Sequence, residues 1–158
     1  TTMDSLQEAI PYGDLYRKDL AKMISEFANI LKKDTKIYRS DQCGQYSDIA
    51  GQTDEMYNYI IQSCKLGLMG LKQDGTIDTS FKPEAKVTRS QFVAVLSRLL
   101  YGSQYNISID SGYKWYEWHV NALKKNKIIT KVDQATLNNR EARMYVWVMF
   151  ERVYKTIQ

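Results

Sequence analysis

The feature that most constrains this chain is a pattern that occurs three times, an arginine followed by apolar residues at fixed distances. The arginines are Arg17, Arg89 and Arg143, and apolar side chains follow each of them at the third, sixth and seventh positions. This spacing places the apolar side chains on one face of an α-helix. Since three such faces must be covered, we predict a mainly α fold of three helix-loop-helix repeats. A second long polar or charged side chain follows each arginine nine residues later: Glu26, Arg98 and Arg152.

The middle repeat contains a first helix ahead of the one that begins at Arg89. Apolar and aromatic residues dominate residues 54–66 and predict a largely buried helix, with Asp48 as a possible N-cap before it. Gly67 is expected to end that helix, because glycine readily takes the left-handed conformation found at helix C-termini.

A loop connects the two helices of the middle repeat. Asp74 and Gly75 mark a turn within it, and Pro83 is expected in a non-helical segment. Thr88 is a favourable N-cap for the second helix, which we expect to run to about Tyr101. The unit is therefore helix, loop, helix, with little strand.

The outer repeats follow the same order more loosely. In the third repeat we expect helices over residues 115–125 and 139–154, with Trp118 packed in the core. In the first repeat, residues 2–9 could form a short first helix. The predicted repeats together form one compact domain and span residues 1–36, 37–104 and 105–158.

Composition and charge argue against several classes of protein. The net charge of +4 is spread over 158 residues, without the clustered positive charge of a nucleic-acid-binding protein. No stretch approaches the roughly 20 apolar residues that span a bilayer. The chain lacks the nucleophile-elbow, phosphate-loop and zinc-protease motifs, and its one histidine limits triad chemistry. We therefore expect no enzyme activity, cofactor, metal site, nucleic-acid partner or membrane insertion.

The middle repeat resembles the S-layer homology family. The segments that carry the resemblance occur in the family's order, as Tyr-Ser-Asp-Ile at 46–49, Leu-Gly-Leu-Met-Gly at 66–70, Asp-Gly-Thr at 74–76, Phe-Lys-Pro at 81–83 and Val-Thr-Arg-Ser-Gln-Phe at 87–92. No single segment is specific, but the ordered set is. The outer repeats match the family's pattern less well.

The resemblance implies a pseudo-three-fold helical bundle with ligand grooves between neighbouring repeats. It also implies binding of a secondary cell-wall polysaccharide, often one that carries ketal-linked pyruvate, at a bacterial cell surface outside the cell. The chain would then anchor the rest of a larger surface protein, of which it is a fragment or a mature portion. The positions that match the family's ligand-binding residues are Arg89, Thr88, Arg17, Trp115 and Arg143.

Arg89 is also a plausible anion-binding residue on physical grounds alone. A guanidinium can engage a carboxylate with two hydrogen bonds and stays charged at any working pH. Free backbone amides at a helix start add to an anion-binding corner. The alternative role is that of a surface arginine paired with a neighbouring carboxylate.

A structural or self-assembly module that has lost glycan binding is the competing hypothesis. Glu55 stands in the middle repeat where the family has a tryptophan, and the third motif is degraded. An open, tyrosine-lined pocket around Arg89 would favour sugar binding, whereas an internal salt bridge to Arg89 would favour the structural role.

Cys43 and Cys64 are the only cysteines of the chain. Their spacing is not that of a redox pair, and one histidine leaves too few companions for a zinc site. A single disulfide and two buried thiols both remain possible. The cell-surface location that the resemblance implies favours the disulfide.

Overall fold

The computed structural model describes residues 13–108, 110–130, 136–137, 139, 141 and 143–158. In this part of the chain the fold is mainly α, as predicted. Extended pairing among these residues is limited to two isolated bridges, Tyr16 with Lys86 and Leu71 with Ile77. The helices are α1 (Arg17–Ile30), α2 (Ser40–Cys43), α3 (Asp54–Lys65), α4 (Arg89–Tyr101), α5 (Glu117–Lys125) and α6 (Arg143–Ile157).

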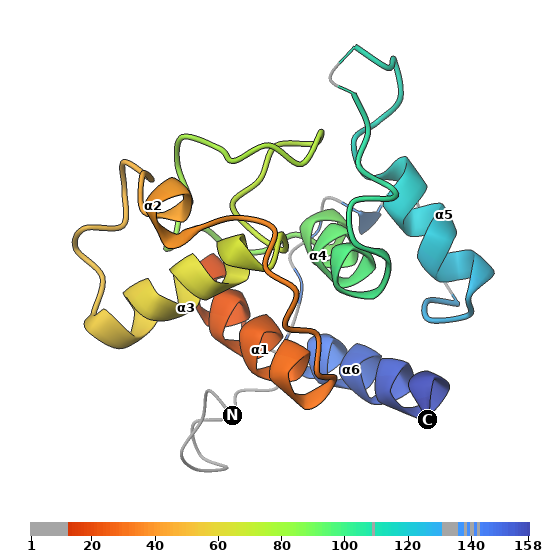
Figure 1. Cartoon of the computed structure of the whole chain (residues 1–158). Helices are drawn as coiled ribbons and strands as arrows, with labels where there is room; N and C mark the ends of the chain where they lie inside the picture. Colours follow the sequence, from red (N-terminus) through yellow and green to blue (C-terminus); the bar gives the residue numbers. More distant parts are fainter. Residues whose placement is uncertain (1–12, 109, 131–135, 138, 140, 142) are drawn as a thin grey trace.

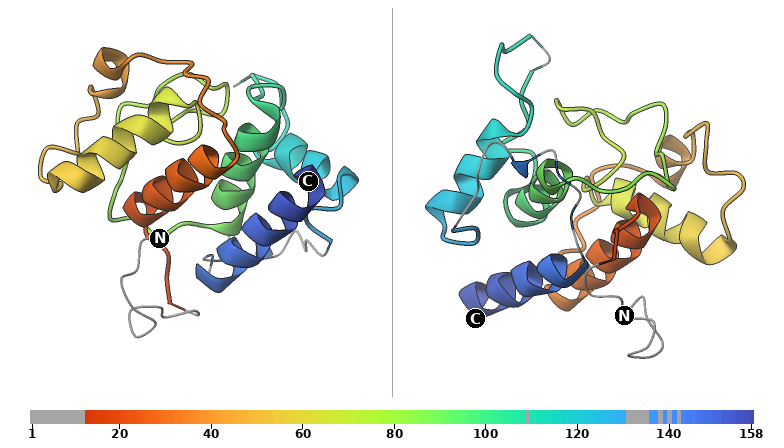
Figure 2. Two further views of the ribbon diagram at one scale, coloured as in Figure 1. Left: turned by 60° about the horizontal axis from the view of Figure 1, so that its bottom comes forward. Right: turned by 180° about the vertical axis from the view of Figure 1, so that it is seen from behind.

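The three helices that begin at the repeated arginines, α1, α4 and α6, lie together, and the longer remaining helices flank two of them (Figures 1 and 2). The α3 helix packs against α1, and α5 packs against α4. Each pair joins the second helix of one predicted repeat to the first helix of the next predicted repeat. Neighbouring predicted repeats therefore pack against each other through these helix pairs.

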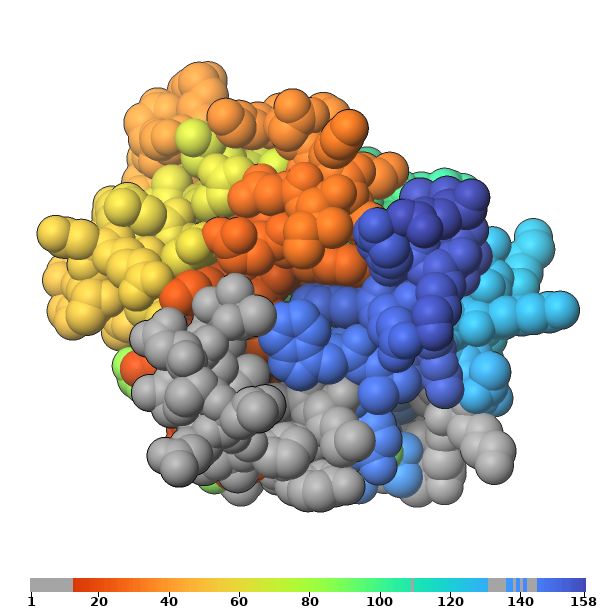
Figure 3. Space-filling model, turned by 90° about the horizontal axis from the view of Figure 1, so that it is seen from below, coloured from red at the N-terminus to blue at the C-terminus, as the bar shows by residue number. Residues whose placement is uncertain are grey.

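The apolar positions after each arginine form the centre of the core. All of them are buried except Met149, which is partly buried against the same cluster. Phe150 of α6 stacks on Phe27 of α1 with ring centroids 4.2 Å apart, and it lies 6.1 Å from Phe92 of α4. Figure 3 shows α6 packed along α1. The three helix faces predicted from the spacing thus meet one another.

Backbone hydrogen bonds join the segment before α1 to the segment before α4. The amide of Arg17 donates to the carbonyl of Ala85 at 2.9 Å. In return, the amide of Val87 donates to the carbonyl of Leu15 at 2.7 Å. This first junction holds the starts of α1 and α4 side by side.

The segment before α4 meets the segment before α6 through the same two kinds of bond. The amide of Arg89 donates to the carbonyl of Asn139 at 2.9 Å. The amide of Glu141 donates to the carbonyl of Val87 at 2.8 Å. Each donor and each acceptor can be counted from the repeated arginine that its own segment leads into. Counted in this way, each one stands at the same position as its counterpart in the first junction. Leu15, Val87 and Glu141 are therefore equivalent residues.

The N-cap of α3 is Thr53, whose side chain accepts the amide of Met56. The prediction that Asp48 caps this helix is therefore wrong. The Asp48 carboxylate instead accepts the amides of Phe81 and Lys82, each at 2.8 Å. Asp48 holds the returning loop rather than a helix end, because the chain turns between it and α3.

The start of α4 is capped as predicted. The Thr88 side chain accepts the amide of Gln91, and the Gln91 side chain accepts the amide of Thr88 in return. Two otherwise unsatisfied amides are thereby paired. The helix ends at Gly102, whose φ of 62° favours glycine.

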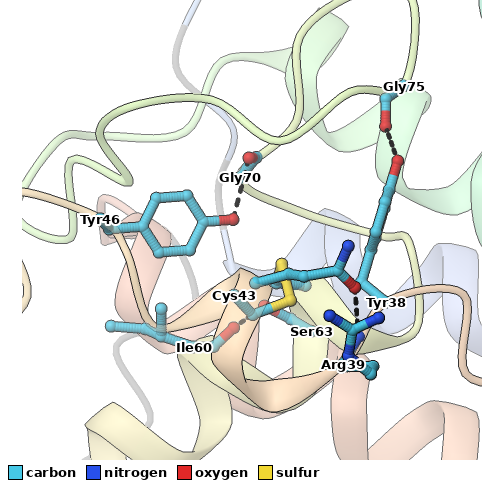
Figure 4. Close-up of a disulfide and its surroundings, with 10 residues drawn as sticks. Tyr38, Arg39, Cys43, Tyr46, Ile60, Ser63, Gly70 and Gly75 are labelled. Atoms are coloured by element: carbon cyan, nitrogen blue, oxygen red, sulfur yellow. Dashed lines mark hydrogen bonds between the residues drawn. A yellow bond between two sulfur atoms is a disulfide. The ribbon is translucent and has the colours of Figure 1, made fainter.

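The predicted disulfide between Cys43 and Cys64 is present, with both residues fully buried (Figure 4). It ties α2, a short helix that the sequence did not predict, to α3. Close by, the Tyr46 hydroxyl donates to the Gly70 carbonyl at 2.9 Å. The disulfide and this bond tie the segment before α3 to α3 and to the start of the loop that follows it.

Several finer predictions differ from the structure. Trp118 is 41% exposed rather than in the core, because the buried face of α5 consists of His119, Val120, Ala122 and Leu123. The first half of α3 is not buried, since only its C-terminal half reaches the core. The helices α5 and α6 begin later than predicted, and the helix expected over 2–9 lies outside the described residues.

Candidate functional site

Arg17 lines a groove of about 480 Å³, which we call the Arg17 groove. It lies between α1, α4 and the loop of the middle repeat. Among the described residues, four cationic side chains and one carboxylate line it. The residues that matter for its chemistry are Arg17, Lys72, Asp78, Lys82, Arg98 and Trp115.

The Arg17 guanidinium is held by the loop before α4. Its Nε donates to the Phe81 carbonyl at 2.7 Å, and the guanidinium lies 5.1 Å from the centroid of the Phe81 ring. Burial lowers the pKa of Arg17, while Tyr46, Asp78 and Asp48 act in the opposite direction. Among the described residues, no carboxylate forms an ion pair with Arg17. Its orientation is thus fixed without a side-chain counter-ion from this part of the chain.

Arg98 adds a second guanidinium to the same groove. It is 7% exposed, donates from Nε to Asn106 at 2.9 Å and donates to the Lys72 carbonyl at 3.0 Å. Burial, together with the charge of Arg17, lowers the pKa of Arg98 to about 10, so it remains cationic at neutral pH. The sequence marked Arg98 only as part of a pattern and gave it no role.

Trp115 lines the Arg17 groove as well. The sequence analysis placed Arg17 in the first predicted repeat and Trp115 in the third, and the structure brings both to one groove. Trp115 is partly buried, with its ring edge-on to Tyr116 at 5.4 Å between centroids. An indole face of this kind offers an apolar surface, while the neighbouring cations offer charge.

Arg89 lines a second groove of about 430 Å³, the Arg89 groove, between α4 and α6. Its lining is largely apolar. The charged side chains among its described lining residues are Arg89, Glu141 and Arg152, and the hydroxyl-bearing ones are Thr130, Thr136 and Tyr145. The Nε of Arg89 lies 4.0 Å from a carboxylate oxygen of Glu141, which is 6% exposed. The Arg89 guanidinium also lies 5.7 Å from the centroid of the Tyr145 ring. The Arg89 groove thus contains both the tyrosine that would favour sugar binding and the internal carboxylate that would favour a structural role.

The remaining predicted site residues are placed as follows. The Thr88 hydroxyl caps α4 and lies 3.1 Å from the Ser90 hydroxyl. Its capping partner Gln91 lines the Arg17 groove. Arg143 begins α6, but its side chain lies outside the described part of the structure.

Sequence reasoning missed Glu141, although a signal for it exists. It stands two residues before the third arginine, where the other repeats carry the apolar Leu15 and Val87. Aligning the repeats on their arginines would have shown a carboxylate at this otherwise apolar position.

His119 is fully buried on α5, with its Nδ1 2.8 Å from the Ser97 hydroxyl of α4. No hydrogen-bond partner is present for its Nε2 among the described residues. It is remote from solvent and packs α5 onto α4.

Comparison with known proteins supports the middle repeat's resemblance. The family model of the S-layer homology domain matches residues 45–93, which contain every segment that carries the resemblance. A search of curated proteins found no match. S-layer homology domains are non-catalytic domains that generally anchor surface proteins to bacterial cell-wall polymers. No helix of the described residues is both long and apolar enough to cross a membrane. Residues 45–93 of the chain thus match the S-layer homology domain family.

Proposed function

We propose that this chain is a non-catalytic module that anchors a larger protein to the cell surface by binding acidic sugars of a cell-wall polysaccharide. The observation that carries this proposal is the charge of the Arg17 groove. Among the described residues, its charged lining consists of the cations Arg17, Lys72, Lys82 and Arg98 and the carboxylate Asp78. Such a surplus of fixed positive charge favours a carboxylate-bearing ligand.

The groove supplies both kinds of contact that an acidic sugar needs. Arg17 is held by a backbone carbonyl rather than by a side-chain counter-ion of the described chain, so its fork can engage a pyruvyl carboxylate. Trp115 can then stack on the apolar face of the sugar ring. The polymer would lie between residues of the first, second and third predicted repeats.

We further propose that the fold is a three-repeat, pseudo-three-fold bundle. The two junctions support this, because equivalent residues make equivalent backbone bonds in both. The converging faces of α1, α4 and α6 support it as well. On this arrangement the Arg17 and Arg89 grooves are equivalent sites at successive repeat boundaries.

A pull-down on purified cell-wall sacculi tests the proposal. We expect the chain to bind sacculi that carry pyruvylated secondary polymer and not sacculi from which the polymer has been removed. Arg17→Gln should weaken binding roughly 10- to 100-fold, since hydrogen bonds to a charged group contribute about 1.5–3 kcal/mol. Arg39→Gln is the matched control, because Arg39 is exposed, lines neither groove and pairs with Asp41.

The competing function is a structural or self-assembly module without glycan binding. The ion pair between Arg89 and Glu141 favours it. Equal binding to both preparations, or to neither, would reject the polysaccharide ligand. Concentration-dependent self-association without glycan, measured by sedimentation, would then support assembly.

A further inference from the structure

The two junctions differ in charge at one pair of equivalent residues. At the first junction the residue whose amide crosses to the neighbouring repeat is Val87, which is fully buried and apolar. At the second junction the equivalent residue is Glu141. The backbone is the same at both places, and only the side chain changes from a valine to a carboxylate.

The Glu141 carboxylate lies where it can compensate the charge of Arg89. A buried carboxylate is costly unless a cation or hydrogen bonds compensate it, so Glu141 is expected to stay near a cation. Arg89 Nε is 4.0 Å away, and Arg152 lines the same groove. The ring of Tyr145 covers the Arg89 guanidinium at 5.7 Å. The arginine therefore already faces one carboxylate and one aromatic ring from its own chain.

We propose that Glu141 acts as a built-in substitute for the ligand's carboxylate and closes the Arg89 groove to acidic sugars. This inference rests on the proposed function, because it assumes that the equivalent Arg17 groove binds such a sugar. An incoming carboxylate at Arg89 would meet the like charge of Glu141 in a largely apolar groove, where such repulsion is only weakly screened. Of these two grooves, the Arg17 groove is then the working acidic-sugar site. Glu141 is the residue that closes the other one.

The test is the number of binding sites for a defined probe, a monosaccharide carrying a ketal-linked pyruvate, measured by calorimetry and by amide chemical shifts. Of the Arg17 and Arg89 grooves, we expect only the Arg17 groove to bind it in the unmodified chain. Glu141→Gln, which keeps the size of the side chain and removes its charge, should add a second site at Arg89. In the double variant Arg17→Gln/Glu141→Gln, the Arg89 site alone should remain.

Two controls separate charge from general effects. Glu151→Gln removes an exposed carboxylate of α6 that pairs with Lys155, and it should leave the number of sites unchanged. The methyl ester of the same probe lacks the negative charge, so it should bind the Arg17 groove at least roughly tenfold more weakly.

The outcomes distinguish this inference from the proposed function. One site in both the unmodified chain and Glu141→Gln would overturn the inference and leave the function standing. No site in the unmodified chain but one in Glu141→Gln would refute the Arg17 site and support closure by Glu141. If Glu141→Gln does not fold, Arg89→Gln in the unmodified background decides, since the inference predicts unchanged affinity and a two-site chain would lose one site.

Discussion

The sole histidine of the chain predicts a loss of stability in mild acid. His119 is fully buried between α5 and α4, and burial, together with the charge of Arg98, lowers its pKa to about 4 from an ordinary 6.5. The neutral ring bonds to Ser97, so protonation would place a positive charge in the core beside an existing cation. In the unfolded chain the same ring would accept a proton near pH 6.5.

The sign and size of the effect follow from this difference in pKa. Because the folded state resists protonation, stability is at its full value above pH 6.5 and falls as the pH drops toward 4. A shift of one unit corresponds to about 1.4 kcal/mol, so the total effect of His119 approaches about 3 kcal/mol below pH 4. Between pH 7 and pH 4.5, His119 should account for a loss of about 2 kcal/mol.

Urea denaturation at both pH values measures this loss, and NMR measures the cause. His119→Gln can still hydrogen-bond to Ser97 but does not titrate, so its stability should fall by about 2 kcal/mol less than that of the unmodified chain. Since the chain has one histidine, its imidazole resonances can be assigned without ambiguity. A midpoint near 6.5 in the folded protein, or an equal loss in His119→Gln, would refute the reasoning.

Three further predictions concern stability and can be checked by chemical denaturation. Replacing the Cys43–Cys64 disulfide by two alanines should cost about 3 kcal/mol, because the bridge closes a loop with a sequence separation of 21; adding reductant to the double variant should change nothing. Phe150→Ala should cost about 3–5 kcal/mol, since its ring joins three helices, whereas Tyr154→Ala on the exposed side of α6 should cost little. Asp48→Ala removes the acceptor of two loop amides and should cost about 1–2 kcal/mol, and an equal effect from mutating any exposed aspartate would contradict this explanation.

The helices of the fold could be predicted because their signals are local. The face of α4 follows from apolar spacing, and its start follows from the capping box of Thr88 and Gln91. These features depend on residues within one or two turns of each other. Trp118 was mispredicted because local spacing identifies a helix face but not which neighbouring helix covers it.

The contacts that shape the candidate site are not local, and the sequence predicted them less well. Asp48 resembles an N-cap, yet its partners are amides more than 30 residues away. Trp115 and Arg17 were assigned to different repeats, yet they line one groove because α5 packs on α4 rather than within its own repeat. Pairing helices across predicted repeats would have brought these residues together.

Arg17 and Arg89 show why an arginine motif alone does not define an anion site. Both begin a helix, both precede the same apolar spacing, and both donate their amide to the next repeat's loop. Arg89 matches the family motif better, but the described lining of its groove has one further cation, Arg152, and the carboxylate Glu141, whereas that of the Arg17 groove has three further cations and the carboxylate Asp78. Arg98 and Arg152 stand at equivalent positions, so the difference arises from Glu141 in one case and from Lys72 and Lys82 in the other. We therefore expect the ligand preference of each motif to depend largely on the sequence of the predicted repeat that follows it.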